Sequence, residues 1–200
     1  MRPNCGLNLL KKWPIFMDKA LPHFKKLKSS ELNVLDENPV EDARDYIFFK
    51  LIAHKMPPTV KVQITHDDNK KKKYYKPSIV ESQNAFILHV TNQSEIKNRL
   101  EQCRKVHLGR GTTLQPLIIA VGPTTKDIKD FYVAVEHVLY KMDSVLKAVD
   151  ICFKVIHVLN AQYPLESISI WTFIQKYFYN IDCKSDKKIS SVSCFLSDLM

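Results

Sequence analysis

The chain has 200 residues, of which 45% are hydrophobic and 26% are charged, and its formal net charge is +9. A chain of this length buries enough surface to fold as one globular unit, so it needs neither a disulfide nor a structural metal. Only four glycines are present, which disfavours a glycine-rich nucleotide-binding loop. The basic excess favours acidic partners, with plain solubility as the alternative.

The cysteines and the N-terminal residues indicate an intracellular protein. Five cysteines is an odd number, and none stands in a CxxC pair, which is typical of free thiols in a reducing compartment. The first thirty residues carry several lysines and no apolar stretch of the kind that signal peptides contain. No segment approaches the roughly 20 apolar residues that cross a bilayer. We therefore expect no membrane partner and a cytoplasmic or nuclear location.

Apolar periodicity and helix-capping residues place the elements of the N-terminal half. Pro14 and Pro22 each remove a backbone donor, so the first helical segment is expected to be broken. Pro39, Glu41 and Asp42 are typical of a helix start. The expected elements are a broken helix over 7–27, a loop over 28–38, a helix from 39 to about 54, strands over 60–65 and 86–90, and a helix over 94–106.

The second half has a more regular pattern. A continuous apolar run between Pro116 and Gly122 is typical of a strand buried on both faces. Asp143 and Ser144 are typical N-cap residues for the helix that follows. The expected elements are strands over 117–121, 131–136 and 138–141, and helices over 145–160 and 165–179. Polar residues of the first of these helices recur at steps of three and four and predict one wet edge: Lys147, Asp150, Lys154 and His157.

Together these elements predict an α+β fold. We expect a small mixed or antiparallel sheet packed by two C-terminal helices, with a helical N-terminal part. Residues 1–58 would form the helical part and residues 59–200 the α+β domain, and the two would make one compact unit.

The least core-like stretch is a lysine run followed by two tyrosines. Lysines can neutralise phosphates and tyrosines can stack on bases, so this stretch is the candidate contact with nucleic acid or an acidic protein. The alternatives are a solvated charged loop and a nuclear-localisation signal. The candidate contact residues are Lys70, Lys71, Lys72, Lys73, Tyr74, Tyr75 and Lys76.

The sequence contains no linear motif of a metal site or of nucleophilic catalysis. Cys103 and His107 stand at i, i+4, but they make one pair where a structural zinc site needs four ligands. Residues 122–126 follow a buried strand and could bind an anion, although a turn with a helix cap is favoured. The carboxylates Asp127 and Asp130 are typical of a solvated loop. We assign no catalytic residue, metal or cofactor.

Four segments, in their order along the chain, resemble a known family. They are YIFFKLI (46–52), LQPLIIAVG (114–122), FYVAVEHVLYKMDSVLKAVDICFKVIHVLNAQYP (131–164) and WTFIQKYFYNI (171–181). They resemble an uncharacterised, multicopy family of insect, fish and cnidarian proteins whose copies suggest descent from mobile elements. Longer members carry Cys/His zinc fingers far upstream, so the resemblance is to their C-terminal region. It spans residues 7–199 and implies lineage, with no functional residues to carry over.

The function expected from these observations is a non-enzymatic interaction module that binds nucleic acid or an acidic partner weakly through the basic loop. Two alternatives stay open. One is a degenerate nucleic-acid-processing enzyme of a mobile element, which requires two or three carboxylates converging around a divalent ion. The other is a structural self-assembly domain that uses exposed apolar surface.

Overall fold

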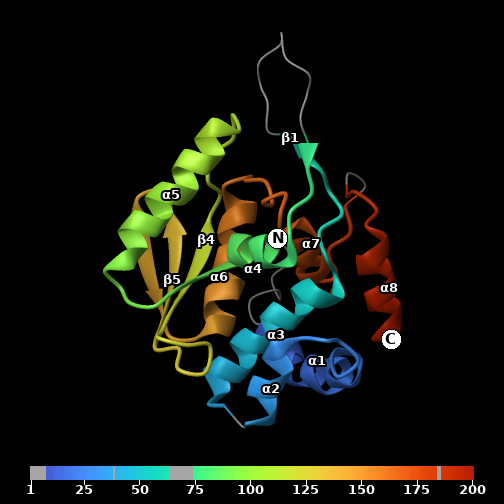
Figure 1. Cartoon of the computed structure of the whole chain (residues 1–200). Coiled ribbons are helices and arrows are strands. Elements are labelled where there is room, and N and C mark those ends of the chain that lie inside the picture. The colour runs from blue at the N-terminus through green and yellow to red at the C-terminus, as the bar shows by residue number, and fades with distance from the viewer. Residues whose placement is uncertain (1–7, 38, 64–73, 184–185) are drawn as a thin grey trace.

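The computed structural model describes residues 8–37, 39–63, 74–183 and 186–200. Within these ranges, helices surround a four-stranded mixed sheet, which confirms the predicted α+β class (Figure 1). No helix in the described ranges is long and apolar enough to cross a bilayer.

The N-terminal part is helical, as expected, and consists of α1 (Asn8–Phe24), α2 (Ser30–Asp36) and α3 (Glu41–Lys55). α1 continues through Pro14 and Pro22, so the prediction of a broken helix was wrong. Each proline costs about 3 kcal/mol in a helix interior, whereas each large side chain that becomes fully buried contributes about 1.5–3 kcal/mol. α1 survives because it buries a full stripe of apolar side chains: Leu9, Trp13, Phe16, Ala20 and Phe24.

Two short helices stand where the sequence predicted none. α2 replaces the loop expected over 28–38, and the Ser29 side chain accepts a hydrogen bond from the backbone N–H of Glu31. α4 (Ile79–Phe86) begins with a capping box, in which Ser78 and Glu81 each bond the backbone of the other. Between these helices, β1 (Val62–Gln63) and β2 (Tyr74–Tyr75) pair antiparallel.

The main sheet has the strand order β3-β4-β5-β6. Its strands are β3 (Ile87–Val90), β4 (Leu117–Val121), β5 (Asp130–Val135) and β6 (Val138–Met142). β3 and β4 are parallel and are joined through α5 (Glu95–Gly109), whereas the β4–β5 and β5–β6 pairs are antiparallel. All five residues of β4 are buried, as the apolar run predicted.

Helices cover the two faces of the sheet unequally. On one face, Ile96 and Leu100 of α5 pack with Leu88 and Ile119 in a small cluster. On the other face, α6 (Val145–Val158) packs against the sheet within the large cluster. α7 (Ile168–Tyr177) packs chiefly against α3 and against a third C-terminal helix, α8 (Ser190–Asp198), which the sequence patterns did not predict.

One aromatic cluster joins the helical part to the rest of the chain. The ring of Trp13 lies 4.3 Å from that of Phe49 and 5.8 Å from that of Phe178, between centroids. All three side chains are almost completely buried. Residues of both expected parts, 1–58 and 59–200, therefore contribute to the same core.

The wet edge predicted for α6 is interrupted at its centre. Asp150 is 0% exposed, because Tyr179 from beyond α7 covers it. The Tyr179 hydroxyl and the Lys154 ammonium each donate a 2.6 Å hydrogen bond to its carboxylate. The prediction for Asp150 was wrong, because a partner distant in sequence satisfies this carboxylate in the core.

Candidate interaction site

Only part of the predicted basic loop can be placed. Lys70, Lys71, Lys72 and Lys73 lie outside the described residues. Tyr74 and Lys76 are exposed.

Tyr75, in contrast, is half-buried. Its ring centroid lies 4.7 Å from the guanidinium carbon of Arg110, and its hydroxyl lies 3.5 Å from the carboxylate of Glu166, to which it donates. One face of the Tyr75 ring is thus occupied and unavailable for base stacking.

Behind Tyr75 lies a cavity of about 290 Å³, here called the inner pocket, between α4, α5 and residues 164–166. Its lining includes an ion pair in which Arg110 Nη1 lies 2.5 Å from Glu166 Oε1. The Glu166 side chain is only 8% exposed. Arg110 therefore neutralises Glu166, and the rest of the pocket wall is largely apolar, including Leu88, Leu114 and Leu117.

The i, i+4 pair Cys103 and His107 lines this pocket. Burial raises the pKa of the Cys103 thiol, against a weaker opposing effect of Arg99 and Arg104. Burial lowers the pKa of His107, while Glu166 partly offsets and Arg110 adds to this effect. Both groups are therefore neutral near pH 7, which does not suit an activated nucleophile and its base.

On the other side of α5 lies a larger depression, here called the end groove, of about 1000 Å³. It is lined by one face of α5, residues 112–116, the β5–β6 turn and the end of α6. The inner pocket and the end groove are lined by different residues of α5 and share Leu114 and Gln115, so α5 lies between them.

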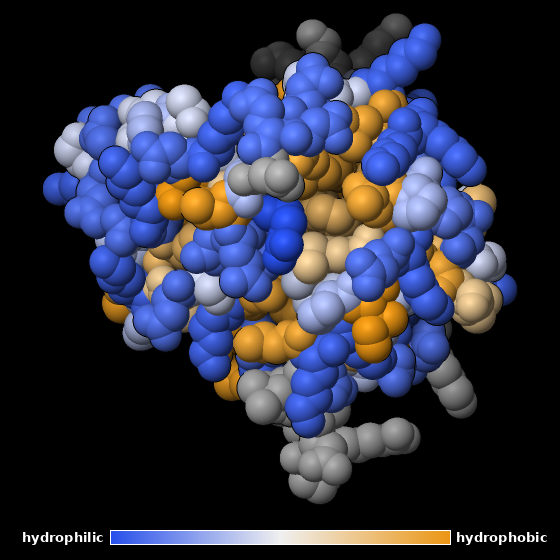
Figure 2. All heavy atoms as spheres, turned by 90° about the horizontal axis from the view of Figure 1, so that it is seen from below, coloured by the Kyte–Doolittle hydropathy of each residue, from blue (hydrophilic) through white to orange (hydrophobic). Residues whose placement is uncertain are grey.

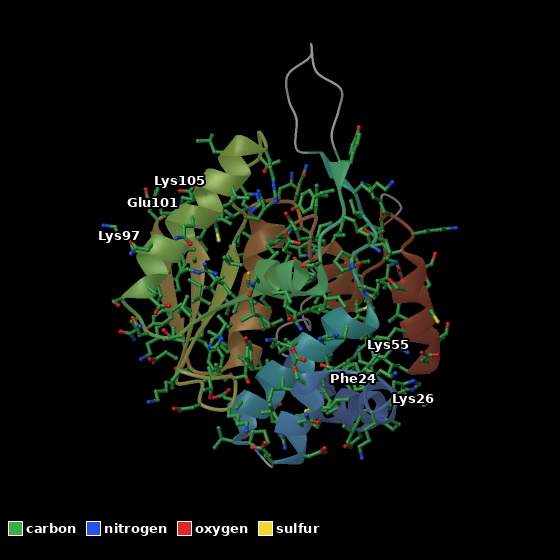
Figure 3. All side chains as sticks on the ribbon, in the orientation of Figure 1. Phe24, Lys26, Lys55, Lys97, Glu101 and Lys105 are labelled. Atoms are coloured by element: carbon green, nitrogen blue, oxygen red, sulfur yellow. The ribbon has the colours of Figure 1, made fainter. Side chains whose placement is uncertain are left out.

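Charged side chains follow the α5 wall of the end groove. Lys97, Glu101 and Lys105 are spaced by four residues and lie in a row along the helix (Figure 3). Arg104 has a different role, because it donates a hydrogen bond to the carbonyl oxygen of Glu136 in the β5–β6 turn. Glu136 has a φ of 52°, a strained value for a non-glycine residue. Arg104 thus holds the turn, while Lys97 and Lys105 face solvent.

Exposed apolar side chains gather at the same end of the molecule. Of the twelve large hydrophobic residues exposed in the described ranges, seven lie on β6, on the C-terminal halves of α5 and α6, or at the C-cap of α6. These seven are Val106, Leu108, Val138, Leu139, Tyr140, Val158 and Leu159. Leu108 is 78% exposed, and Leu108 and Leu159 line the end groove. Leu108 and Leu159 therefore share the end groove with Lys97 and Lys105.

A second groove, of about 780 Å³, lies between α1, α7 and α8 and is also lined by lysines. Lys12 donates to the carbonyl oxygen of Tyr177, and Lys19 donates to that of Leu199. The two ammonium groups thus bond carbonyl oxygens at the C-terminal ends of α7 and α8. They are therefore less available to an acidic partner than Lys97 and Lys105. Viewed from the α1–α2 end, hydrophobic side chains reach the surface among hydrophilic ones (Figure 2).

The candidate anion site over residues 122–126 is a backbone turn in the structure. Residues 122–126 form a tight turn, in which the backbone N–H of Asp127 donates to Thr124 and a β-carbon on Gly122 would lie 2.0 Å from the Asp127 carbonyl oxygen. The turn is therefore packed on its own backbone.

The carboxylates considered for an enzyme remnant are paired separately. Asp127 lies near Lys129, Asp130 pairs with Lys141 on β6, and the buried Asp150 pairs with Lys154. In the described part of the chain, no group of three His, Cys, Asp or Glu residues could hold a metal ion. These pairings favour a structural role for each carboxylate.

Comparison with family models, with curated proteins and with solved structures finds no match to this chain. The resemblance inferred from the sequence segments stays a prediction.

Sequence reasoning missed the end groove and the Arg110–Glu166 pair. The helix over 94–106 was interpreted only through its apolar side, which indeed packs on the sheet. The available signal was the row Lys97, Glu101, Lys105 followed by the apolar Leu108, just before a helix-ending glycine. The row by itself does not indicate a groove, because the other walls come from residues distant in the sequence: 112–116, 135–137 and 159–161.

Proposed function

We propose that the chain is a non-enzymatic interaction module that binds an acidic, amphipathic segment of a partner protein along the end groove. The observation that carries this proposal is the coincidence of solvent-facing lysines and exposed aliphatic side chains on one concave surface. A helix with an apolar stripe and acidic flanks matches such a groove.

The sign of the partner's charge follows from the lysines. Lys97 and Lys105 have no ion-pair partner among the described residues, while Arg104 is engaged with the β5–β6 turn. The chain as a whole carries a formal charge of +9, which accelerates encounter with an acidic molecule.

The aliphatic character of the groove favours a protein over a nucleic acid. Single-stranded nucleic acids are held by aromatic side chains that stack on bases. The groove instead presents Leu108 and Leu159, whereas Tyr75 lines the inner pocket on the other side of α5, with Arg110 over one face of its ring. Leucines of this kind suit the apolar stripe of a helix.

The test uses a fluorescein-labelled peptide of about 18 residues with leucine on one helical face and glutamate on the other. Fluorescence anisotropy on the intact chain should show saturable binding. A scrambled peptide of the same composition keeps the charge but loses the apolar stripe, and should bind at least about tenfold more weakly.

The variant Lys97→Glu/Lys105→Glu reverses the two groove charges and should weaken peptide binding by about tenfold or more, since each exposed pair contributes about 0.5–1 kcal/mol and becomes a repulsion. The control Lys11→Glu/Lys25→Glu makes the same change in net charge at exposed positions on or next to α1, across the molecule from α5 (Figure 1). Equal loss in both variants, or tight binding of a single-stranded DNA oligonucleotide with none of the peptide, would overturn the proposal.

A nuclear location belongs to the same proposal, because the lysine run over 70–73 is typical of a nuclear-localisation signal. Replacing these lysines with alanine in a fluorescent fusion should move the protein from the nucleus to the cytoplasm. Cytoplasmic fluorescence of the unaltered fusion would remove this part of the proposal.

A further inference from the structure

β6 leaves one edge of the main sheet open. In the described part of the chain, β6 pairs with β5 alone. Val138, Leu139 and Tyr140 are 51%, 42% and 50% exposed, although they are apolar and consecutive. α6 packs on the same sheet but leaves Val138 and Tyr140 accessible. An exposed apolar edge strand is a template for pairing with another strand.

The β5–β6 register shows which backbone groups of β6 point outward. Val135 and Val138 flank a two-residue turn, so they form a hydrogen-bonded pair, as do Val133 and Tyr140 two residues further along. The backbone N–H and C=O groups of Leu139 and Lys141 therefore point away from β5. They are free to bond a strand laid along the edge.

The residues around Tyr140 are complementary to themselves. If two β6 strands pair antiparallel with Tyr140 opposite Tyr140, then Val138 faces Met142 and His137 faces Asp143. Apolar side chains meet apolar ones, and at each end an imidazole meets a carboxylate.

The remaining pair places Leu139 opposite Lys141. Each Lys141 thus faces Leu139 and not the other Lys141, and its ammonium already lies 2.7 Å from Asp130 of its own chain. In this register, Leu139 of each strand exchanges its outward backbone bonds with Lys141 of the other, which uses the groups that β5 leaves free.

We propose that β6 pairs with β6 of a second copy of this chain, antiparallel about a two-fold axis at Tyr140, to form a continuous eight-stranded sheet. This pairing does not require partner binding, although His137 in the β5–β6 turn also lines the end groove. The interface is isologous, so it closes at the dimer and does not propagate into a fibre.

Disulfide trapping tests the register. Tyr140 sits in a non-hydrogen-bonded pair on the axis, where the two α-carbons are about 4.5 Å apart and a disulfide can form. Tyr140→Cys should give a cross-linked dimer under mild oxidation, in a background where Cys5, Cys183 and Cys194 are serine. Leu139→Cys is the matched control, because it faces Lys141 and not its own copy. Equal cross-linking of both variants, or of neither, would overturn the register.

A charge swap separates pairing from a general loss of structure. His137→Asp and Asp143→Lys should each weaken dimerisation about tenfold, because each substitution acts twice in the symmetric dimer. The double variant His137→Asp/Asp143→Lys should restore the dimer, since a carboxylate and an ammonium then face one another at each end of the pairing. A double variant as weak as the single ones would contradict the proposed pairing.

Sedimentation equilibrium of the intact chain supplies the third readout. Without any peptide, the protein should sediment with twice the chain mass of 23.2 kDa. A monomer at about 100 µM, which is above the dissociation constants of most stable dimers, would refute the dimer. That result would leave the peptide-binding proposal standing, because peptide binding is measured separately and does not require the dimer.

Discussion

Glu31 links the packing of the N-terminal helices to pH. Its carboxylate lies 3.6 Å from Lys50 Nζ and 3.5 Å from His54 Nε2, both on α3, and it accepts a hydrogen bond from Gln83 on α4. Burial by itself would raise the pKa of Glu31. Hydrogen bonds from Ser29 and the backbone, together with the two nearby α3 side chains, outweigh burial and hold this pKa at about 2.

The size of the effect follows from linkage. A pKa of about 2 in the folded chain, against 4.5 in the unfolded one, corresponds at most to about 3 kcal/mol. Glu31 is partly wet, so solvent screening reduces this to about 1–2 kcal/mol. Because folding lowers the pKa, the stabilisation is complete above pH 4.5 and is lost as the pH falls from 4.5 towards 2.

The perturbation is Glu31→Gln, assayed by urea unfolding followed by circular dichroism. The variant should be about 1–2 kcal/mol less stable than the parent at neutral pH, and this difference should shrink towards zero near pH 2. Glu37→Gln is the control, since Glu37 is exposed and its one ion-pair partner among the described residues is Lys126. A difference between the parent and Glu31→Gln that stays constant with pH would refute the reasoning.

Three further substitutions test the packing. Trp13→Ala should cost about 3–5 kcal/mol in a single unfolding transition seen by both near- and far-UV circular dichroism, because Trp13 packs in the core shared by both parts of the chain; two separate transitions would contradict a shared core. Gly122→Ala should cost at least about 1–3 kcal/mol in urea unfolding, because the added β-carbon meets a backbone carbonyl. Gly109→Ala is the control and should be neutral or slightly stabilising, because no atom lies within 4 Å of the added β-carbon. Arg110→Ala should lower the free energy of unfolding by about 2–4 kcal/mol, because it leaves Glu166 buried and unpaired. Adding Glu166→Ala should recover most of this loss. A double-mutant cycle with no coupling between the two positions would contradict the pairing.

The elements predicted well from sequence are those whose signal is local and long. The apolar run of β4 and the cap at Ser144 belong to this class. α4 and α8 escaped prediction because helices of eight or nine residues carry little periodicity, and their stability comes from caps and from packing. α1 was predicted to break because its prolines are visible in the sequence, whereas the aromatic partners that hold it together are distant in the chain.

In the candidate site, too, local sequence signals could be predicted and contacts between distant residues could not. A lysine run is visible in any window of the sequence, so the basic loop was the first candidate, yet its four lysines lie outside the described residues. The end groove is built from α5, the β5–β6 turn and the end of α6. Its concave shape depends on tertiary contacts such as the one between Arg104 and Glu136. Composition could predict an acidic partner but not the surface that would receive it.

The most direct test of the proposed function is the anisotropy titration of the acidic amphipathic peptide against three proteins: the parent, Lys97→Glu/Lys105→Glu and Lys11→Glu/Lys25→Glu. We predict that the α5 charge reversal weakens binding by about tenfold or more, while the control reversal changes it less than about threefold. Equal affinities of the peptide for all three proteins, or no binding to the parent, would contradict a partner site in the end groove.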